Sequence, residues 1–60
     1  MTEEKIKAHN ILHDLGKIDG QKHIKQVLYL VEDIGSNDLS IYWKNVEKEF
    51  NYAINNHTPY

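Results

Sequence analysis

The chain has 60 residues, a formal net charge of −2, 40% hydrophobic residues and no cysteine. This length allows one domain at most, spanning residues 1–60, and a domain so small is marginally stable on its own. The lack of cysteine excludes disulfide and thiolate staples, and the mild, interspersed charge excludes a broad basic surface for nucleic acid.

Transport signals are not evident at the start of the chain. The opening Met-Thr-Glu-Glu has neither the basic start nor the apolar stretch of a signal peptide. The longest unbroken apolar run, residues 27–31, is far too short to cross a bilayer. We therefore expect a cytoplasmic protein with no membrane partner.

The first predicted helix covers residues 3–15. Thr2 is a suitable N-cap, and the acidic residues after it suit a helix N-terminus. Gly16 can adopt the left-handed conformation that ends helices. The apolar stripe of this helix comprises Ala8, Ile11, Leu12 and Leu15.

The second predicted helix covers residues 20–34. Asp19 is its expected N-cap, with Gly20 beside it, and Gly35 is its expected end. Its apolar stripe comprises Ile24, Val27, Leu28, Val31 and Ile34, with Leu30 at the margin.

The third predicted helix covers residues 38–55, and each of residues 36–38 can cap its start. It carries the single Trp and the single Phe of the chain, the side chains with the most area to bury. We expect this helix to organise the core. Its apolar stripe comprises Leu39, Tyr42, Trp43, Val46, Phe50, Ala53 and Ile54.

Three amphipathic stripes joined by short glycine-marked turns predict an all-α fold, a small antiparallel three-helix bundle. No segment has the alternation of a strand. Because the core is small, a dimer formed by exchange of helices is the alternative architecture.

One short motif suggests metal chemistry. The run His13-Asp14-Leu15-Gly16-Lys17, preceded by two apolar residues, resembles the signature of the HD phosphohydrolase superfamily. That resemblance implies that His13 and Asp14 ligate a metal that activates water for phosphoester hydrolysis. The same run also fits the end of an ordinary helix, with a glycine stop and a lysine at the negative end of the dipole. We expect no enzymatic activity and no cofactor.

His9 and His13 are four residues apart and therefore share a helix face. Together with Asp14 they are the candidate metal ligands of the chain. A zinc site needs three or four protein ligands, and the neighbours Ile6, Asn10 and Lys17 supply none. An exposed polar face that carries two histidines is the alternative interpretation.

Residues 30–43 resemble a helix-turn-helix with Gly35 at the turn. The first turns of the reader helix would present acidic and aromatic side chains, with Lys44 as their one cation, to a groove lined by phosphates. The chain also has no arginine, the residue that reads guanine with two hydrogen bonds. A nucleic-acid-binding regulator is therefore the alternative function rather than the favoured one.

Apolar side chains remain on the outside once the three stripes are buried. Ile41 and Tyr52 lie eleven residues apart on one side of the third helix, with Lys48 between them. Tyr29 points away from the stripe of the second helix. Because contiguous exposed apolar surface marks association, these four residues are the predicted partner-binding site.

The length, the Lys/Asn/Ile/Tyr bias and the lack of arginine and cysteine resemble short proteins encoded by phages and prophages of low-GC Gram-positive bacteria. The resemblance implies an accessory role, such as binding a host or phage protein. We expect a small non-enzymatic module that binds another protein, or a second copy of itself.

Overall fold

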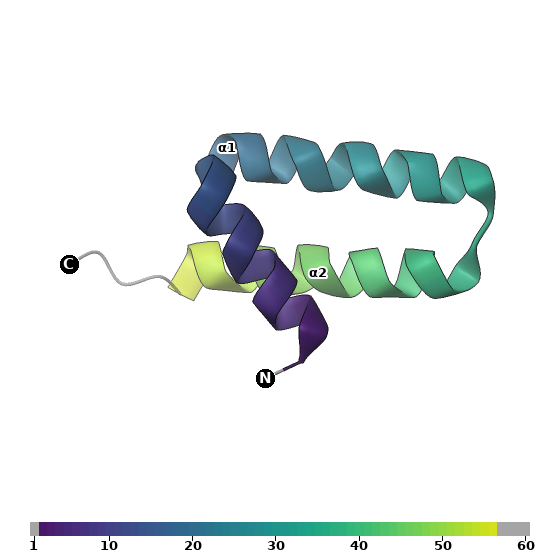
Figure 1. The fold of residues 1–60 in the computed structure, drawn as a ribbon. Helices are drawn as coiled ribbons and strands as arrows, with labels where there is room; N and C mark the ends of the chain where they lie inside the picture. The colour runs from purple at the N-terminus through teal and green to yellow at the C-terminus, as the bar shows by residue number, and fades with distance from the viewer. Residues whose placement is uncertain (1, 57–60) are drawn as a thin grey trace.

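The computed structural model describes residues 2–56, which form two α-helices and no strand (Figure 1). Helix α1 spans Glu3–Ile34 and helix α2 spans Asn37–Asn56. The all-α prediction is confirmed. The three-helix bundle is not, because the first two expected helices belong to one element that continues through the expected connection at residues 16–19.

Helix α1 changes direction at Gly16. Its φ of 83° and ψ of −176° are not helical, yet the residues on both sides of it are. Only glycine adopts this backbone conformation readily. The break divides α1 into an N-terminal arm, residues 3–15, and a C-terminal arm, residues 17–34, that point in different directions (Figure 1). Asp19 is therefore inside a helix and not the cap that we expected.

The start of α1, the end of α1 and the start of α2 are capped by residues that the sequence predicts as caps. The hydroxyl of Thr2 accepts a hydrogen bond from the backbone N–H of Lys5 at 3.3 Å. Gly35 has a φ of 80°, and its N–H donates to the carbonyl of Val31 at 3.0 Å. The Ser36 hydroxyl accepts from the Leu39 N–H at 3.3 Å, so α2 begins one residue earlier than expected.

The C-terminal arm and α2 run side by side in opposite directions, joined by a turn at residues 35–36 (Figure 1). The N-terminal arm folds back and crosses α2 (Figure 1). One contact across this crossing is the hydrogen bond from the Asn45 amide to the Glu4 carboxylate, at 3.4 Å. The N-terminal arm does not extend to the end of the helix pair that carries the turn (Figure 1).

All three segments contribute to the core, and Gly20 allows them to approach. A Cβ atom added to Gly20 would lie 2.6 Å from Cζ of Phe50 and 3.3 Å from Cγ2 of Ile11. Sequence reasoning placed this glycine at a helix start, whereas the structure places it in the core. The buried hydrophobic residues are Ala8, Ile11, Ile24, Val31, Val46 and Phe50.

Each predicted stripe has one exposed end. Leu15, Ile34 and Leu39 are all exposed, although each was expected in the core. Within residues 2–56, no helix combines the length and the apolar character that crossing a membrane requires.

Candidate functional site

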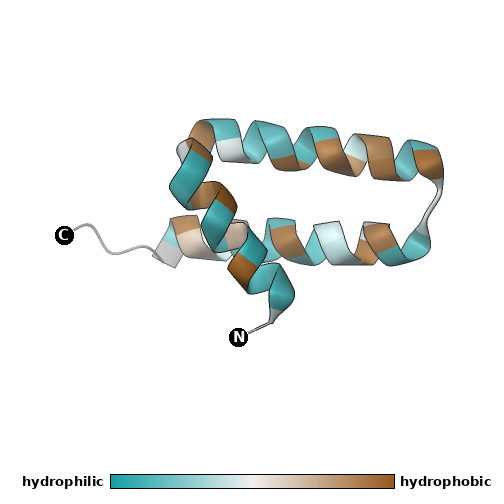
Figure 2. Cartoon of the chain, in the orientation of Figure 1, coloured by the Kyte–Doolittle hydropathy of each residue, from teal (hydrophilic) through white to brown (hydrophobic). Residues whose placement is uncertain are grey.

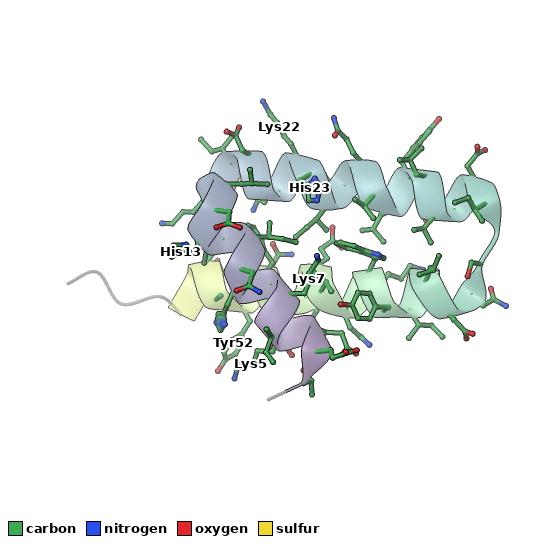
Figure 3. All side chains as sticks on the ribbon, in the orientation of Figure 1. Lys5, Lys7, His13, Lys22, His23 and Tyr52 are labelled. Carbon is green, nitrogen blue, oxygen red and sulfur yellow. The ribbon has the colours of Figure 1, made fainter. Side chains whose placement is uncertain are left out.

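Trp43 marks the line where the N-terminal arm stops covering the helix pair. The Lys7 ammonium lies 5.9 Å from the centre of the Trp43 ring. The rings of His23 and Tyr42 both meet Trp43 edge-on, with centroids 6.4 Å and 5.7 Å away. Lys7 and His23 are labelled in Figure 3, where they approach the same region from the two arms of α1. All three helical segments therefore meet at this indole.

A row of side chains on α1 begins at His23, beside Trp43, and continues toward the turn. His23, Val27, Leu30 and Ile34 follow the i, i+4, i+7, i+11 spacing of one helix face. Val27 is partly buried, whereas Leu30 is 60% exposed and Ile34 is 71% exposed. His23 at the start of the row is exposed, and from Val27 to Ile34 the exposure rises with distance from the arm.

Helix α2 contributes Leu39 and Tyr42 beside this row. Leu39 stands four residues before Trp43, and Tyr42 stands four residues before Val46, so both extend the apolar stripe of α2 toward the turn. Leu39 is exposed and Tyr42 partly buried. Figure 2 shows hydrophobic segments on both helices near the turn. We call this surface the hairpin face and define it as Val27, Leu30, Ile34, Leu39 and Tyr42.

The hairpin face has an acidic residue on each side. Asp33 lies three residues after Leu30 on α1, and Asp38 lies four residues before Tyr42 on α2. Both are exposed. Residues 26–43 contain these two aspartates and Glu32 but no lysine or histidine. This end of the helix pair is therefore both apolar and uniformly acidic.

The opposite side of the helix pair has a different character. A hollow of about 180 Å³ there is lined mainly by polar side chains around the edges of Ile24 and Phe50. Its polar residues are Gln21, Lys25, Glu47 and Asn51. Both signs of charge are present in it. Three of the large exposed hydrophobic residues, Leu30, Ile34 and Leu39, lie on the hairpin face, and none of them lines this hollow.

The four residues predicted to bind a partner do not form one apolar patch. Ile41 and Tyr52 are both exposed on α2, but Asn45 and Lys48 separate them, and Asn45 is bonded to Glu4. Lys5 from the N-terminal arm, with Lys48, Glu49 and Tyr52, lines a hollow there; Lys5 and Tyr52 are labelled in Figure 3.

Tyr29 is exposed on the C-terminal arm of α1. It lies five residues after Ile24 and two before Val31, both buried, so it projects from the side away from the core. Glu32 and Asp33 line a hollow with it. The structure therefore does not bring Tyr29 together with the Ile41, Lys48 and Tyr52 row.

The candidate metal ligands lie at the bend of α1. Nδ1 of His13 is 3.4 Å from Oδ1 of Asp14, and their side chains are 90% and 75% exposed. His9 is also exposed, one turn earlier. Among the described residues, no three His, Cys, Asp or Glu side chains gather closely enough to hold a metal ion.

Sequence reasoning did not identify the hairpin face, because it assigned Ile34 and Leu39 to the core. The signal that was available is the loop length. A turn as short as residues 35–36 makes the neighbouring helices antiparallel, and a 13-residue first segment is too short to cover the full length of both.

Comparison with protein-family models, with curated proteins and with solved structures gives no match for this chain. The resemblances to HD phosphohydrolases and to phage proteins therefore remain hypotheses based on residues and composition.

Proposed function

We propose that this chain is a small, non-enzymatic protein-binding module and that the hairpin face is its contact surface. The observation that carries the proposal is the exposure of three large hydrophobic side chains near the turn, Leu30 and Ile34 on α1 and Leu39 on α2. A continuous apolar surface that extends a core is typical of surfaces that another protein covers.

The composition suggests where to look for the partner. Because it resembles phage and prophage proteins of low-GC Gram-positive bacteria, we propose an accessory role that involves a bacterial or phage protein. The acidic character of residues 26–43, which include the whole stretch that resembles a helix-turn-helix, gives no support to a nucleic-acid partner.

The test is affinity capture from a lysate of such a bacterium, with tagged wild type beside Leu30→Ser. The matched control is Ile18→Ser, because Ile18 is also a large exposed residue on the C-terminal arm of α1 but lies off the hairpin face. We expect a specific protein that wild type and Ile18→Ser retain and Leu30→Ser loses. Circular dichroism of all three proteins checks that they remain helical.

Two results would contradict the proposal. Loss of capture only in an Ile41→Glu/Tyr52→Glu variant would place the contact surface on the outer row of α2. Empty eluates, together with a wild-type dimer that Leu30→Ser converts to monomer in light scattering, would show that the hairpin face serves self-association.

A further inference from the structure

The chemistry of the hairpin face specifies the kind of partner. Building on the proposed function, we infer that this face binds a cationic amphipathic helix of another protein. The apolar side of that helix would cover Leu30, Ile34 and Leu39, and its lysine or arginine side chains would flank it, facing Asp33 and Asp38.

Charge complementarity is the first argument. The apolar centre lies between Asp33 on α1 and Asp38 on α2, and no cation occurs in residues 26–43 to neutralise them. Acidic residues on both sides of an apolar strip attract a helix whose basic residues border its apolar stripe. They repel anionic lipid surfaces and phosphate backbones.

The size of the face is the second argument. His23, which contacts Trp43 beside the arm, lies eleven residues before Ile34. Eleven helical residues extend about 16 Å, whereas a helix with its side chains is about 10 Å wide. The N-terminal arm already packs as a helix on the neighbouring part of the same surface (Figure 1). One further helix therefore fits beside the arm and would continue its layer.

The same charges disfavour a second copy of this chain as the occupant. In a symmetric dimer each hairpin face would meet its own image. Asp33 and Asp38 of both copies would then gather around one apolar contact with no lysine from residues 26–43 to offset them. Like charges placed together at an interface oppose its formation.

The test uses the whole chain and two fluorescein-labelled model helices with leucines at the same heptad spacing. One peptide has lysine at its remaining positions and the other has glutamate. We expect the anisotropy of the lysine peptide to rise on titration with wild type, with an affinity that falls as salt increases. The glutamate peptide is expected to bind at least tenfold more weakly.

Two pairs of variants locate the binding. Asp33→Lys should weaken binding of the lysine peptide at least threefold, whereas Asp14→Lys makes the same change of net charge at the bend and should have less than a twofold effect. The Asp33→Lys protein should remain folded, because a lysine in the last turn of a helix is favoured by its dipole. Leu30→Ser should weaken binding at least fivefold and Ile18→Ser should not.

The inference is overturned if the glutamate peptide binds as tightly as the lysine peptide, if neither binds, or if Asp33→Lys and Leu30→Ser bind like wild type. Failure of the inference is distinguishable from failure of the proposed function. A lysate protein captured through Leu30 while the lysine peptide does not bind would leave the function standing and remove only the cationic helix.

Discussion

Gly20 of α1 lies against the edge of the Phe50 ring of α2, so closely that a methyl group on Gly20 would overlap two ring carbons, at 2.6 and 2.8 Å. Phe50 is 1% exposed and has little room to move. This contact sets the separation of the two helices at the point where the N-terminal arm also packs, through Ile11.

Gly20→Ala should therefore destabilise the protein, although alanine is the better helix former. Overpacking a core costs about 1–3 kcal/mol, against about 1 kcal/mol gained from helix propensity. With two overlapping ring atoms we expect a net loss of about 1–2 kcal/mol in the free energy of unfolding, measured by urea denaturation.

A double-mutant cycle tests the cause. Phe50→Leu removes the overlapping ring atoms, so the combined Gly20→Ala/Phe50→Leu variant should lose less stability than the two single losses added together. Additive losses would show that the ring is not what excludes the methyl group.

Gly16→Ala should disturb the bend of α1 rather than its packing. A Cβ at this position would meet no atom within 4 Å, but φ is +83° with ψ near 180°, a conformation close to exclusive to glycine. We expect a loss of about 1–3 kcal/mol, or a straightened α1 whose arm no longer covers Trp43. Red-shifted Trp43 fluorescence with unchanged helicity would reveal the second outcome.

Chemical synthesis of the 60-residue chain offers a control for this prediction. D-Alanine at position 16 favours positive φ and should preserve the bend and the Trp43 emission. If L-alanine and D-alanine behave alike, the backbone conformation of Gly16 is not what directs the arm.

Ile24 and Ile18 provide a matched comparison of burial on the same arm. Ile24 is 1% exposed and Ile18 is 71% exposed. Ile24→Val should cost about 0.5–1.5 kcal/mol, whereas Ile18→Val should change stability by less than about 0.5 kcal/mol. Thermal melts followed by circular dichroism report both, and equal effects would contradict the assignment of Ile24 to the core.

Lys7→Gln should weaken docking of the N-terminal arm. The Lys7 ammonium lies over the Trp43 ring, and a cation at such a site contributes about 0.5–1 kcal/mol. Lys22→Gln makes the same change on a side chain that points away from α2 (Figure 3) and should have no comparable effect. We expect the Trp43 emission to change in the first variant only.

How much of this fold the sequence predicts depends on which interactions are local. Thr2, Ser36 and Gly35 act on neighbouring backbone groups, so their capping roles follow from residue type and position. The burial of Val46 and Phe50 follows from periodicity, since the longest apolar stripe must face the core. The helical class is predictable for the same reason.

The role of Gly20 and the exposure of the hairpin face depend instead on contacts between segments that are distant in the sequence. Gly20 looks like a turn residue until Phe50 is placed beside it. Periodicity groups Ile34 and Leu39 with the buried stripes but does not show that the N-terminal arm ends before reaching them. The proposed site was missed for this reason, because its exposure results from where the arm crosses and not from a local pattern.

Because the bend at Gly16 joins the N-terminal arm directly to the helix pair, the arm binds that pair as an intramolecular ligand. Glu4 and Asn45 are 41 residues apart in sequence, yet the arm is joined to the helix beside α2 through a single non-helical residue. A tether this short gives the arm an effective concentration in the millimolar range or above, so weak contacts suffice to hold it in place. A partner that lies beside the arm is not covalently linked to the helix pair, so its affinity must come from its own contacts alone.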